Sequence, residues 1–379
     1  MERIYLDHAA TTPLNQSVLN KMLPYFTENF GNADSPHALG RKAVNAVDDA
    51  RDRLAERLGV RSNELYFTSG GTEADNWAVI GGAYAQKAKG KDHVIVSAIE
   101  HHAVLYAAER LEKEGFSVSY LPVNDGGVVE LNALQGLLTD RTGLVAVMTV
   151  NNETGVTQPV KELARITHAR GALFFTDAVQ AAPHIPLDIK GWDVDILSIS
   201  SHKFYGPKGC GVLYVKNGVK IDRFVGGGEQ ERGLRGGTTN VPAAVGLAAA
   251  FCENQDTRSA TNAHIDRLSA LFLDEISSLD GVSVNGQGDK LSAILNLRVK
   301  GVSNVDLLYK LDLQGVCIAV GSACASASVK PSHVLLAMGL TEEEARESVR
   351  ISFGKENTEE QIRFAAKAFV EAVKNLRKF

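Results

Sequence analysis

The sequence predicts an α/β protein in which a mostly parallel sheet has helices on both faces and a smaller α+β domain follows. Two observations indicate this fold class. From about residue 64 to residue 215, short apolar runs alternate with amphipathic segments, a spacing typical of βαβ units. From about residue 262 onward, helical patterns are mixed with only a few strands.

The large sheet is predicted from apolar runs rich in β-branched and aromatic residues. These runs are Glu64–Thr68, His93–Ala98, Val118–Val123, Leu144–Val150, Ala172–Thr176, Asp195–Ser200 and Gly211–Val215. Amphipathic segments between them predict helices over Glu73–Lys89, Ala103–Lys113 and Val160–Arg170. Because ligands of such sheets bind beyond the carboxyl ends of the strands, the residues that directly follow each run are the first candidates for a site.

The C-terminal region predicts a different arrangement of elements. In chain order these are a helix over Ala263–Leu279, a strand over Leu291–Val299, a helix over Val305–Leu311, a strand over Val316–Val320, a Ser/Ala-rich loop, a strand over Val349–Phe353 and a helix over Thr358–Phe379. This mixture is typical of a small α+β domain.

The composition excludes several classes of protein. The 379 residues carry a formal net charge of −5 and are 44% hydrophobic, as expected for a globular enzyme with a sizeable core. An acidic balance argues against direct nucleic-acid binding, which needs a basic face, although a protein partner stays open. No apolar stretch of about 18 residues predicts a membrane span. The first residues lack the apolar core of a signal peptide, so we expect a cytoplasmic protein.

The chain has four cysteines, and their spacing predicts no zinc site. In a reducing compartment we expect Cys210, Cys252, Cys317 and Cys324 to be free thiols. Cys210 lies between glycines, Cys317 lies in an apolar run, and Cys252 is predicted to end an alanine-rich helix. These three positions suit structural cysteines, and we expect no resident metal ion.

A glycine-rich turn follows the first predicted strand. It reads Thr68-Ser69-Gly70-Gly71-Thr72-Glu73 and opens the next helix. Glycines permit a tight turn, and backbone N–H groups together with the Thr72 hydroxyl can bind a phosphate at the start of a helix. Taken alone, the same pattern also suits an ordinary strand-to-helix turn.

Two further strand ends carry an acid and a lysine. Asp177 follows the strand that ends at Thr176, with Gln180 three residues later. Lys203 follows the strand that ends at Ser200 and precedes a Gly/Pro-rich turn. The acid suits either a helix cap or the partner of a protonated ring nitrogen. The lysine suits either a surface position or a Schiff base with a carbonyl group.

A phosphate-binding turn, an acid and a lysine at three strand ends of one sheet are what pyridoxal 5'-phosphate (PLP) requires. The turn binds its phosphate, Asp177 keeps its pyridine nitrogen protonated, and Lys203 forms the Schiff base. His101 follows another strand and is placed to stack on the ring, and Asn152 is placed to hydrogen-bond the phenolic oxygen. The competing prediction, a dinucleotide enzyme, lacks a GxGxxG motif with an acid about 20 residues further on.

In their order along the chain, these motifs resemble those of the cysteine desulfurases of the NifS/IscS group, within the class V aminotransferase family. The resemblance extends over essentially the whole chain, and the matching segments are Tyr5–Pro13, Ser69–Asn76, Ser200–Gly209, Arg235–Thr238 and Gly321–Cys324. It implies the PLP-dependent transferase fold type I, with a seven-stranded, mainly parallel sheet. It also implies a large PLP-binding domain over residues 15–260 and a small domain formed by residues 1–14 and 261–379.

The resemblance also implies a role for each residue at a matching position. The implied ligands of the cofactor phosphate are Gly71, Thr72, Ser200 and His202. The implied ring contacts are His101 as the stacking residue and a catalytic residue, Asn152 and Gln180 near the phenolic oxygen, Asp177 at the nitrogen and Lys203 as the Schiff-base lysine. Arg350 is expected to bind the substrate carboxylate with help from Asn32. Thr238 is expected to reach the phosphate of a neighbouring subunit, which implies a homodimer.

Cys324 separates a desulfurase from an aminotransferase. It lies in a run of small residues, 321–328, that offers little to bury and is predicted to form a mobile loop. A thiolate there is placed to attack the sulfur of L-cysteine and to carry it away as a persulfide. The length of the segment resembles the long-loop branch, which hands sulfur directly to an iron–sulfur scaffold or a tRNA-thiolating enzyme. Whether Cys324 also serves as a transient iron–sulfur ligand stays open.

Three alternatives follow from the same residues. A selenocysteine lyase or short-loop desulfurase shares the ring chemistry, and a class V aminotransferase needs no Cys324. A non-catalytic partner that uses the fold only for docking needs none of Lys203, Asp177, Cys324 and Arg350. The presence of all four together favours the desulfurase, for which the expected products are L-alanine and a Cys324 persulfide.

Overall fold

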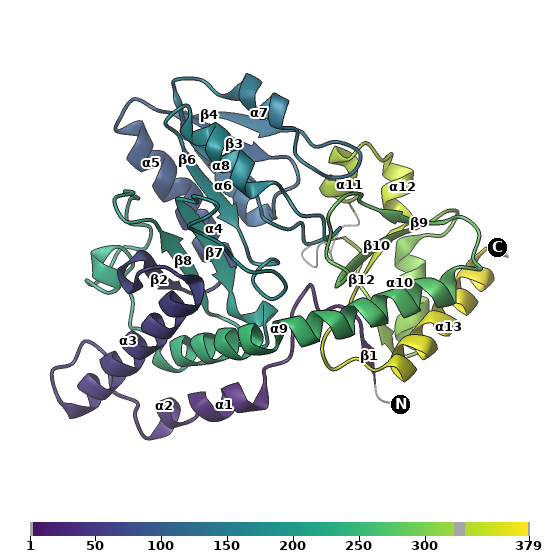
Figure 1. Ribbon diagram of the computed structural model, residues 1–379, viewed down its shortest axis with the longest axis horizontal. Helices are drawn as coiled ribbons and strands as arrows, with labels where there is room; N and C mark the ends of the chain where they lie inside the picture. Colours follow the sequence, from purple (N-terminus) through teal and green to yellow (C-terminus); the bar gives the residue numbers. More distant parts are fainter. Residues whose placement is uncertain (1–2, 322–329, 378–379) are drawn as a thin grey trace.

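The computed structural model describes residues 3–321 and 330–377, and its centre is a seven-stranded sheet (Figure 1). The strand order is β2-β8-β7-β6-β5-β3-β4, and β8 alone runs antiparallel to its two neighbours. The strands are β2 Leu65–Thr68, β3 His93–Ser97, β4 Ser117–Leu121, β5 Thr142–Ala146, β6 Leu173–Asp177, β7 Ile196–Ser200 and β8 Gly211–Val215. The seven predicted strands and the mainly parallel sheet are therefore confirmed.

The inner strands of the sheet bury both of their faces, whereas the edge strand β4 is largely exposed. On β5, Val145 packs into one hydrophobic cluster while Leu144 and Ala146 pack into another, as the period of two along a strand requires. Helices cover both faces, which explains why the inner strands are largely apolar and lack an alternation of buried and exposed positions. The first cluster includes α1 Gln16–Met22, α3 Ala38–Leu58, α7 Leu131–Leu137, α8 Val160–His168 and the first part of α9 Val241–Ile276. The second includes α4 Gly71–Asn76, α5 Gly82–Lys87 and α6 His102–Lys113.

The helix predicted over Glu73–Lys89 begins at Gly71 and contains a π-helical segment, Trp77–Gly81, between α4 and α5. Trp77 is fully buried, and its indole N–H donates to the carbonyl oxygen of Asp222 (2.9 Å). A Cβ atom at Gly81 would lie 2.8 Å from that same carbonyl oxygen. Glycine is therefore required at position 81, where the π-helical turn packs against the backbone of Asp222.

The C-terminal region forms a second hydrophobic core around a three-stranded antiparallel sheet, in the order β12-β10-β9. A parallel pair of short strands, β1 Ile4–Tyr5 and β11 Val316–Cys317, packs beside it and brings the N-terminus into this core. The remaining elements are α2 Pro24–Thr27, β9 Val282–Asn285, β10 Ile294–Val299, α10 Asn304–Leu313, α11 His333–Ala337, α12 Glu342–Arg346, β12 Ser348–Ser352 and α13 Glu359–Leu376.

Two predicted elements of this region are wrong. The helix expected over Ala263–Leu279 is the second half of α9, a continuous helix over Val241–Ile276, so Cys252 lies inside a helix and does not end one. The polar stretch 253–262 is helical because no glycine or proline interrupts it. The strand expected over Val316–Val320 stops at Cys317, and beyond it only Ala319 pairs, through an isolated bridge to Arg350.

Helix α9 joins the two cores, running from beside α3 to beside α13 (Figure 1). Its residues 241–251 contribute to the first cluster of the large sheet, and its residues 265–276 contribute to the C-terminal core. Within the described part of the chain, no helix has the length and the apolar character needed to cross a membrane.

Candidate functional site

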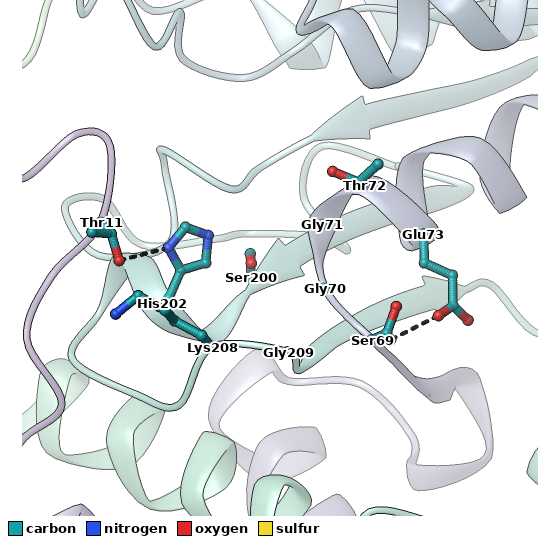
Figure 2. Close-up of a pocket in the computed structure, with 10 residues that line it drawn as sticks. All are labelled: Thr11, Ser69, Gly70, Gly71, Thr72, Glu73, Ser200, His202, Lys208 and Gly209. Carbon is teal, nitrogen blue, oxygen red and sulfur yellow. Dashed lines mark hydrogen bonds between the residues drawn. The ribbon is translucent and has the colours of Figure 1, made fainter. Parts of the chain in front are cut away.

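A pocket of about 330 Å³ lies at the carboxyl ends of β2 and β7 (Figure 2). It joins the glycine-rich turn before α4, the end of β7, the turn that precedes β8, and the N-terminal segment after β1. Its lining residues are Thr11, Ser69, Gly70, Gly71, Thr72, Glu73, Ser200, His202, Lys208 and Gly209. Four predicted phosphate ligands, Gly71, Thr72, Ser200 and His202, therefore lie around one pocket.

The pocket has the chemistry of a phosphate site. A Cβ atom at Gly71 would lie only 3.0 Å from Val179 Cγ2 and 3.3 Å from Ser200 Cβ, so a larger residue would crowd the turn. His202 shares a hydrogen bond with the Thr11 hydroxyl (3.1 Å). Burial, together with the charges of Lys203 and Lys208, lowers the pKa of His202 to about 4. The ring is therefore neutral and offers one N–H and one acceptor nitrogen.

Asp177 ends β6 and is buried, with its Oδ1 accepting the backbone N–H of Val179 (2.8 Å). Burial raises the pKa of Asp177 to about 6, whereas the Val179 N–H and the charge of Lys203 act in the opposite direction. A buried acid beside a cationic group is what a protonated pyridine nitrogen needs as its partner. Pocket, acid and lysine thus fit PLP.

His101 caps the start of α6, where its Nδ1 accepts the backbone N–H of Ala103 (3.2 Å). Burial, and then the charge of Lys203, lowers the pKa of His101 to about 4. The imidazole is therefore neutral at pH 7. Because Lys203 shifts the pKa values of His101, His202 and Asp177 alike, these four side chains form one electrostatic unit.

Lys203 and Gln180 meet at the same backbone group. The Lys203 ammonium donates to the carbonyl oxygens of Ala9 (2.6 Å) and Ala10 (2.8 Å), and the Gln180 amide also donates to Ala9 (2.8 Å). Lys203 and Gln180 line a second, small cavity of about 20 Å³ between the two cores, which is distinct from the phosphate pocket. The N-terminal segment after β1 is thus part of the lysine's environment.

Arg350 lies in the middle of β12 and is 2% exposed. Its Nη2 pairs with Asp7 Oδ1 (2.8 Å), and its Nη1 donates to the backbone carbonyl of Asn152 (2.9 Å). Its Nε is buried and has no hydrogen-bond partner among the described residues. A buried guanidinium with a donor left over is suited to a carboxylate ligand.

Two predicted site residues lie outside this arrangement. Asn32 is exposed, and its side-chain oxygen accepts the backbone N–H of Asp34 (3.0 Å). Thr238 is exposed on the segment that follows Arg235, and Arg235 forms a bidentate pair with Glu73 of the pocket lining (2.8 and 3.0 Å). That pair fixes the segment beside the phosphate pocket while Thr238 faces outward.

The prediction for Cys324 falls on residues 322–329, which lie outside the described residues. The described residues on either side contact the site. Ala319 exchanges two backbone hydrogen bonds with Arg350 (3.0 and 2.8 Å). On the other side, the Ser332 hydroxyl donates to Glu153 (2.5 Å). The first contact is with Arg350 itself, and the second is with Glu153, the residue next to Asn152.

Sequence reasoning gave no role to several residues of the site. Thr11 and Lys208 line the phosphate pocket, and Asp7 pairs with Arg350. All three belong to motifs that the sequence already displays, Tyr5–Pro13 and Ser200–Gly209. The signal was therefore present in the motifs, but only the folded chain shows which of their side chains face the site.

Comparison with known proteins identifies a family for the whole chain. Residues 4–364 match the family described as aminotransferase class-V. The chain is 44% identical over 380 aligned residues to a protein of Clostridium botulinum named cysteine desulfurase IscS, covering 99% of this chain and 96% of that protein.

Solved structures show the same likeness. A structure described as a NifS-like protein superposes with a TM-score of 0.93 at 35% identity, covering 98% of this chain and all of that one. A structure described as SspA in complex with cysteine gives a TM-score of 0.84 at 33% identity, over 94% of this chain and all of that one.

Proposed function

The chain belongs to the class-V aminotransferase family, and from this premise we propose that it is a PLP-dependent cysteine desulfurase. It converts L-cysteine to L-alanine and keeps the sulfur as a persulfide on Cys324. The observation that carries the proposal is the arrangement of Lys203, Asp177, the phosphate pocket and the buried Arg350 in one chain that also contains Cys324.

PLP, when bound, withdraws electrons from the substrate Cα and so makes its proton removable. Gly71, Thr72, Ser200 and His202 hold the phosphate in this proposal. Asp177 holds a proton on the ring nitrogen, and the neutral His101 stacks against the ring. Gln180 and Asn152 complete the contacts near the phenolic oxygen.

The substrate carboxylate binds Arg350. The Nε of this side chain supplies a donor that no described residue uses, and Asp7 and the Asn152 carbonyl fix the plane of the guanidinium. A fixed plane favours bidentate binding of a carboxylate over a single contact. Asn32, which is exposed in the single chain, assists at the same end of the substrate in this proposal.

Lys203 moves the substrate's α-proton. Its ammonium is held by two backbone carbonyls of the N-terminal segment, close enough to His101 and Asp177 to shift their pKa values. Because His101 is neutral at pH 7, its imidazole is able to accept or return a proton beside Lys203.

Cys324 attacks the substrate sulfur as a thiolate. The S–Cβ bond of cysteine breaks, an S–S bond forms on Cys324, and protonation of the remaining fragment gives L-alanine. The contacts of Ala319 with Arg350 and of Ser332 with Glu153 support this role, because they attach both flanks of the cysteine-bearing segment beside the carboxylate-binding residue. We also propose that the persulfide sulfur is delivered to an iron–sulfur scaffold or a tRNA-thiolating enzyme.

We further propose a homodimer and a two-domain organisation. The exposed Thr238 and the Arg235–Glu73 pair support a contact between this segment and the phosphate site of a second subunit. Two separate cores support a large domain over residues 15–260 and a small domain over residues 1–14 and 261–379, with the boundary inside α9. The cytoplasmic location stays a prediction.

The test is a single-turnover assay on purified holoenzyme with L-cysteine and without reductant. The native protein should give alanine matched by protein-bound persulfide, and Cys324→Ala should lose both while keeping the cofactor's absorbance. Cys317→Ala is the matched control, because Cys317 is a partly buried free thiol at the end of β11, and it should behave like the native protein.

Three outcomes would contradict the proposal. Persulfide formation in Cys324→Ala would show that Cys324 is not the nucleophile. Pyruvate in place of alanine would favour an aminotransferase, and turnover of selenocysteine without turnover of cysteine would favour a selenocysteine lyase.

A further inference from the structure

Three carboxyl groups are buried below the carboxyl edge of the large sheet, and the proposed function uses only one of them. Asp177 ends β6, Asp75 lies in α4, and Glu100 lies between β3 and α6, with exposed fractions of 5%, 2% and 0%. The strand order β7-β6-β5-β3 sets Asp177 between the other two. Ser198 of β7 lies opposite Asp177 in the sheet, and its hydroxyl donates a hydrogen bond to Asp75. On the other side, the backbone N–H of Met148, just after β5, donates a hydrogen bond to Glu100.

Glu100 is partnered on one oxygen only. Its Oε1 accepts the backbone N–H of Met148 (2.7 Å) and the hydroxyl of Ser97, whereas its buried Oε2 has no partner among the described residues. Ionised, Glu100 would leave a charged oxygen without any donor, which costs more than a neutral hydroxyl in the same position. Burial raises the pKa of Glu100 to about 8, and the negative charge of Asp177 raises it further, against the two hydrogen bonds to Oε1.

Asp75 is also buried, on the other side of Asp177. Its Oδ1 accepts the Ser198 hydroxyl (2.5 Å). Burial raises the pKa of Asp75 well above its ordinary value, and the charges of Asp177 and then Glu100 add to this. Of the three carboxyl groups, Asp177 is the one whose pKa the cation of Lys203 lowers.

Among the described residues, those that hydrogen-bond to the Glu100 carboxyl group or shift its pKa include no cation. Ser97 reaches it from β3, Met148 from the segment after β5, and the Asp177 charge from β6. The ring of His333, from α11, hydrogen-bonds to the Glu100 backbone carbonyl (3.0 Å) and not to the carboxyl group. Three like charges in one water-excluded region cannot all ionise, so protons must be retained on some of them.

We propose that Asp75 and Glu100 are held as uncharged carboxylic acids at neutral pH and act as positioning residues, so that Asp177 is the one carboxylate presented to the cofactor's ring nitrogen. The role of Asp177 at the ring nitrogen rests on the proposed function. The charge states of Asp75 and Glu100 rest on the geometry of this chain alone.

The test is infrared difference spectroscopy of the holoenzyme in D₂O at pH 7. The difference spectrum between the native protein and Glu100→Gln should contain the C=O band of a protonated carboxyl group. The difference spectrum between the native protein and Asp75→Asn should contain such a band as well. Glu64→Gln is the matched control, because the Glu64 side chain is also buried but its two oxygens accept the backbone N–H groups of Arg61 (2.7 Å) and Asn217 (2.8 Å). Its difference spectrum should contain only carboxylate bands.

Carboxylate bands in place of the protonated band for Asp75 or Glu100 would overturn the proposal. In the native enzyme, the Glu100 band should convert to a carboxylate band as the pH rises through about 8, which tests the proposal even where a variant fails to fold. Since the amides mimic neutral acids, Glu100→Gln and Asp75→Asn should keep the cofactor absorbance and kcat within about twofold of native. A loss as large as that of Asp177→Asn would also overturn it.

The role of Asp177 and the protonation of Asp75 and Glu100 are tested by separate measurements. Should Asp177→Asn leave the cofactor absorbance and the reaction unchanged, the assignment of Asp177 to the ring nitrogen would fall. The infrared bands of Asp75 and Glu100 would still stand or fall by themselves, because they report protonation and not turnover.

Discussion

Arg350 shows how burial makes a single residue specific for its ligand. The side chain is 2% exposed, and two of its three nitrogens are already engaged by Asp7 and Asn152. A buried guanidinium is stable only when paired, so the ion pair with Asp7 keeps it charged and fixed in plane. The remaining nitrogen, Nε, is the group that the proposed function assigns to the substrate.

Replacing this guanidinium by an ammonium tests that geometry. Arg350→Lys keeps the charge but loses the planar fork, so kcat/KM for L-cysteine should fall by about 10- to 100-fold, mainly through KM. Steady-state kinetics measure the effect. Arg165→Lys, an exposed pair with Glu162 (3.0 Å), is the matched control and should leave both constants unchanged. An unchanged KM in Arg350→Lys would refute the carboxylate role.

Four buried or half-buried histidines predict how stability depends on pH. Burial lowers the pKa values of His8, His101, His184 and His202 to about 4 each. These rings are neutral in the folded protein but bind protons in the unfolded chain below a pKa of about 6.5. The contribution of these four rings to the unfolding free energy should therefore be constant above about pH 6.5 and fall between pH 6.5 and 4, by at most about 1.4 kcal/mol per pH unit for each ring.

Urea unfolding at a series of pH values measures this slope. His184→Gln removes a buried ring that the proposed chemistry does not use, so its slope below pH 6.5 should be shallower than the native slope. His37→Asn is the control, since His37 is exposed and asparagine also caps helices well. Equal slopes in native protein and His184→Gln would show that His184 is not a neutral buried ring.

At the scale of elements, α9 is the helix whose extent was predicted wrongly from the sequence. Its polar middle, 253–262, suggested a break between two helices, because an amphipathic pattern fades there. The structure shows why it fades. The helix leaves one core before it enters the other, so its central turns contact little apolar surface. Intrinsic propensity, uninterrupted by glycine or proline, continues the helix across the gap.

A proline in the central turns of α9 tests its continuity. Ser259 is exposed there, so Ser259→Pro should lower the unfolding free energy by about 3 kcal/mol or more, because it removes a hydrogen bond and clashes with the preceding turn. Ser259→Ala should change it by less than about 0.5 kcal/mol. Chemical denaturation compares the two variants. Equal stability of the proline variant would mean that the helix is broken at this point.

At the scale of the whole molecule, we propose that a second chain completes the site. Thr238 is exposed beside a phosphate pocket that its own chain lines without it. If Thr238 serves the pocket of a partner, each active site combines Lys203 of one subunit with Thr238 of the other. A heterodimer of one subunit that lacks Lys203 and one that lacks Thr238 then contains one intact site.

This predicts complementation between subunits. Lys203→Ala should be inactive, and Thr238→Ala should bind PLP about 10-fold more weakly, through loss of a hydrogen bond to a charged phosphate. Co-expressed as a heterodimer, the two should recover native PLP affinity at the site that keeps both Lys203 and a partner's Thr238. Fluorescence titration of PLP measures this. No recovery would mean that Thr238 acts within its own chain or not at all.

The sequence by itself determined the seven strands, the mainly parallel sheet and the family, because apolar periodicity and short ordered motifs are local properties of the chain. It also supplied four of the residues that line the phosphate pocket, Gly71, Thr72, Ser200 and His202, since these lie at or just after strand ends. Only the tertiary structure decided the contacts between distant segments: the joining of two cores by α9, the pairing of Asp7 with Arg350, and the burial of Asp75 and Glu100 around Asp177. The physical reason is that burial and charge pairing depend on which segments meet in space, and neither spacing nor composition records that.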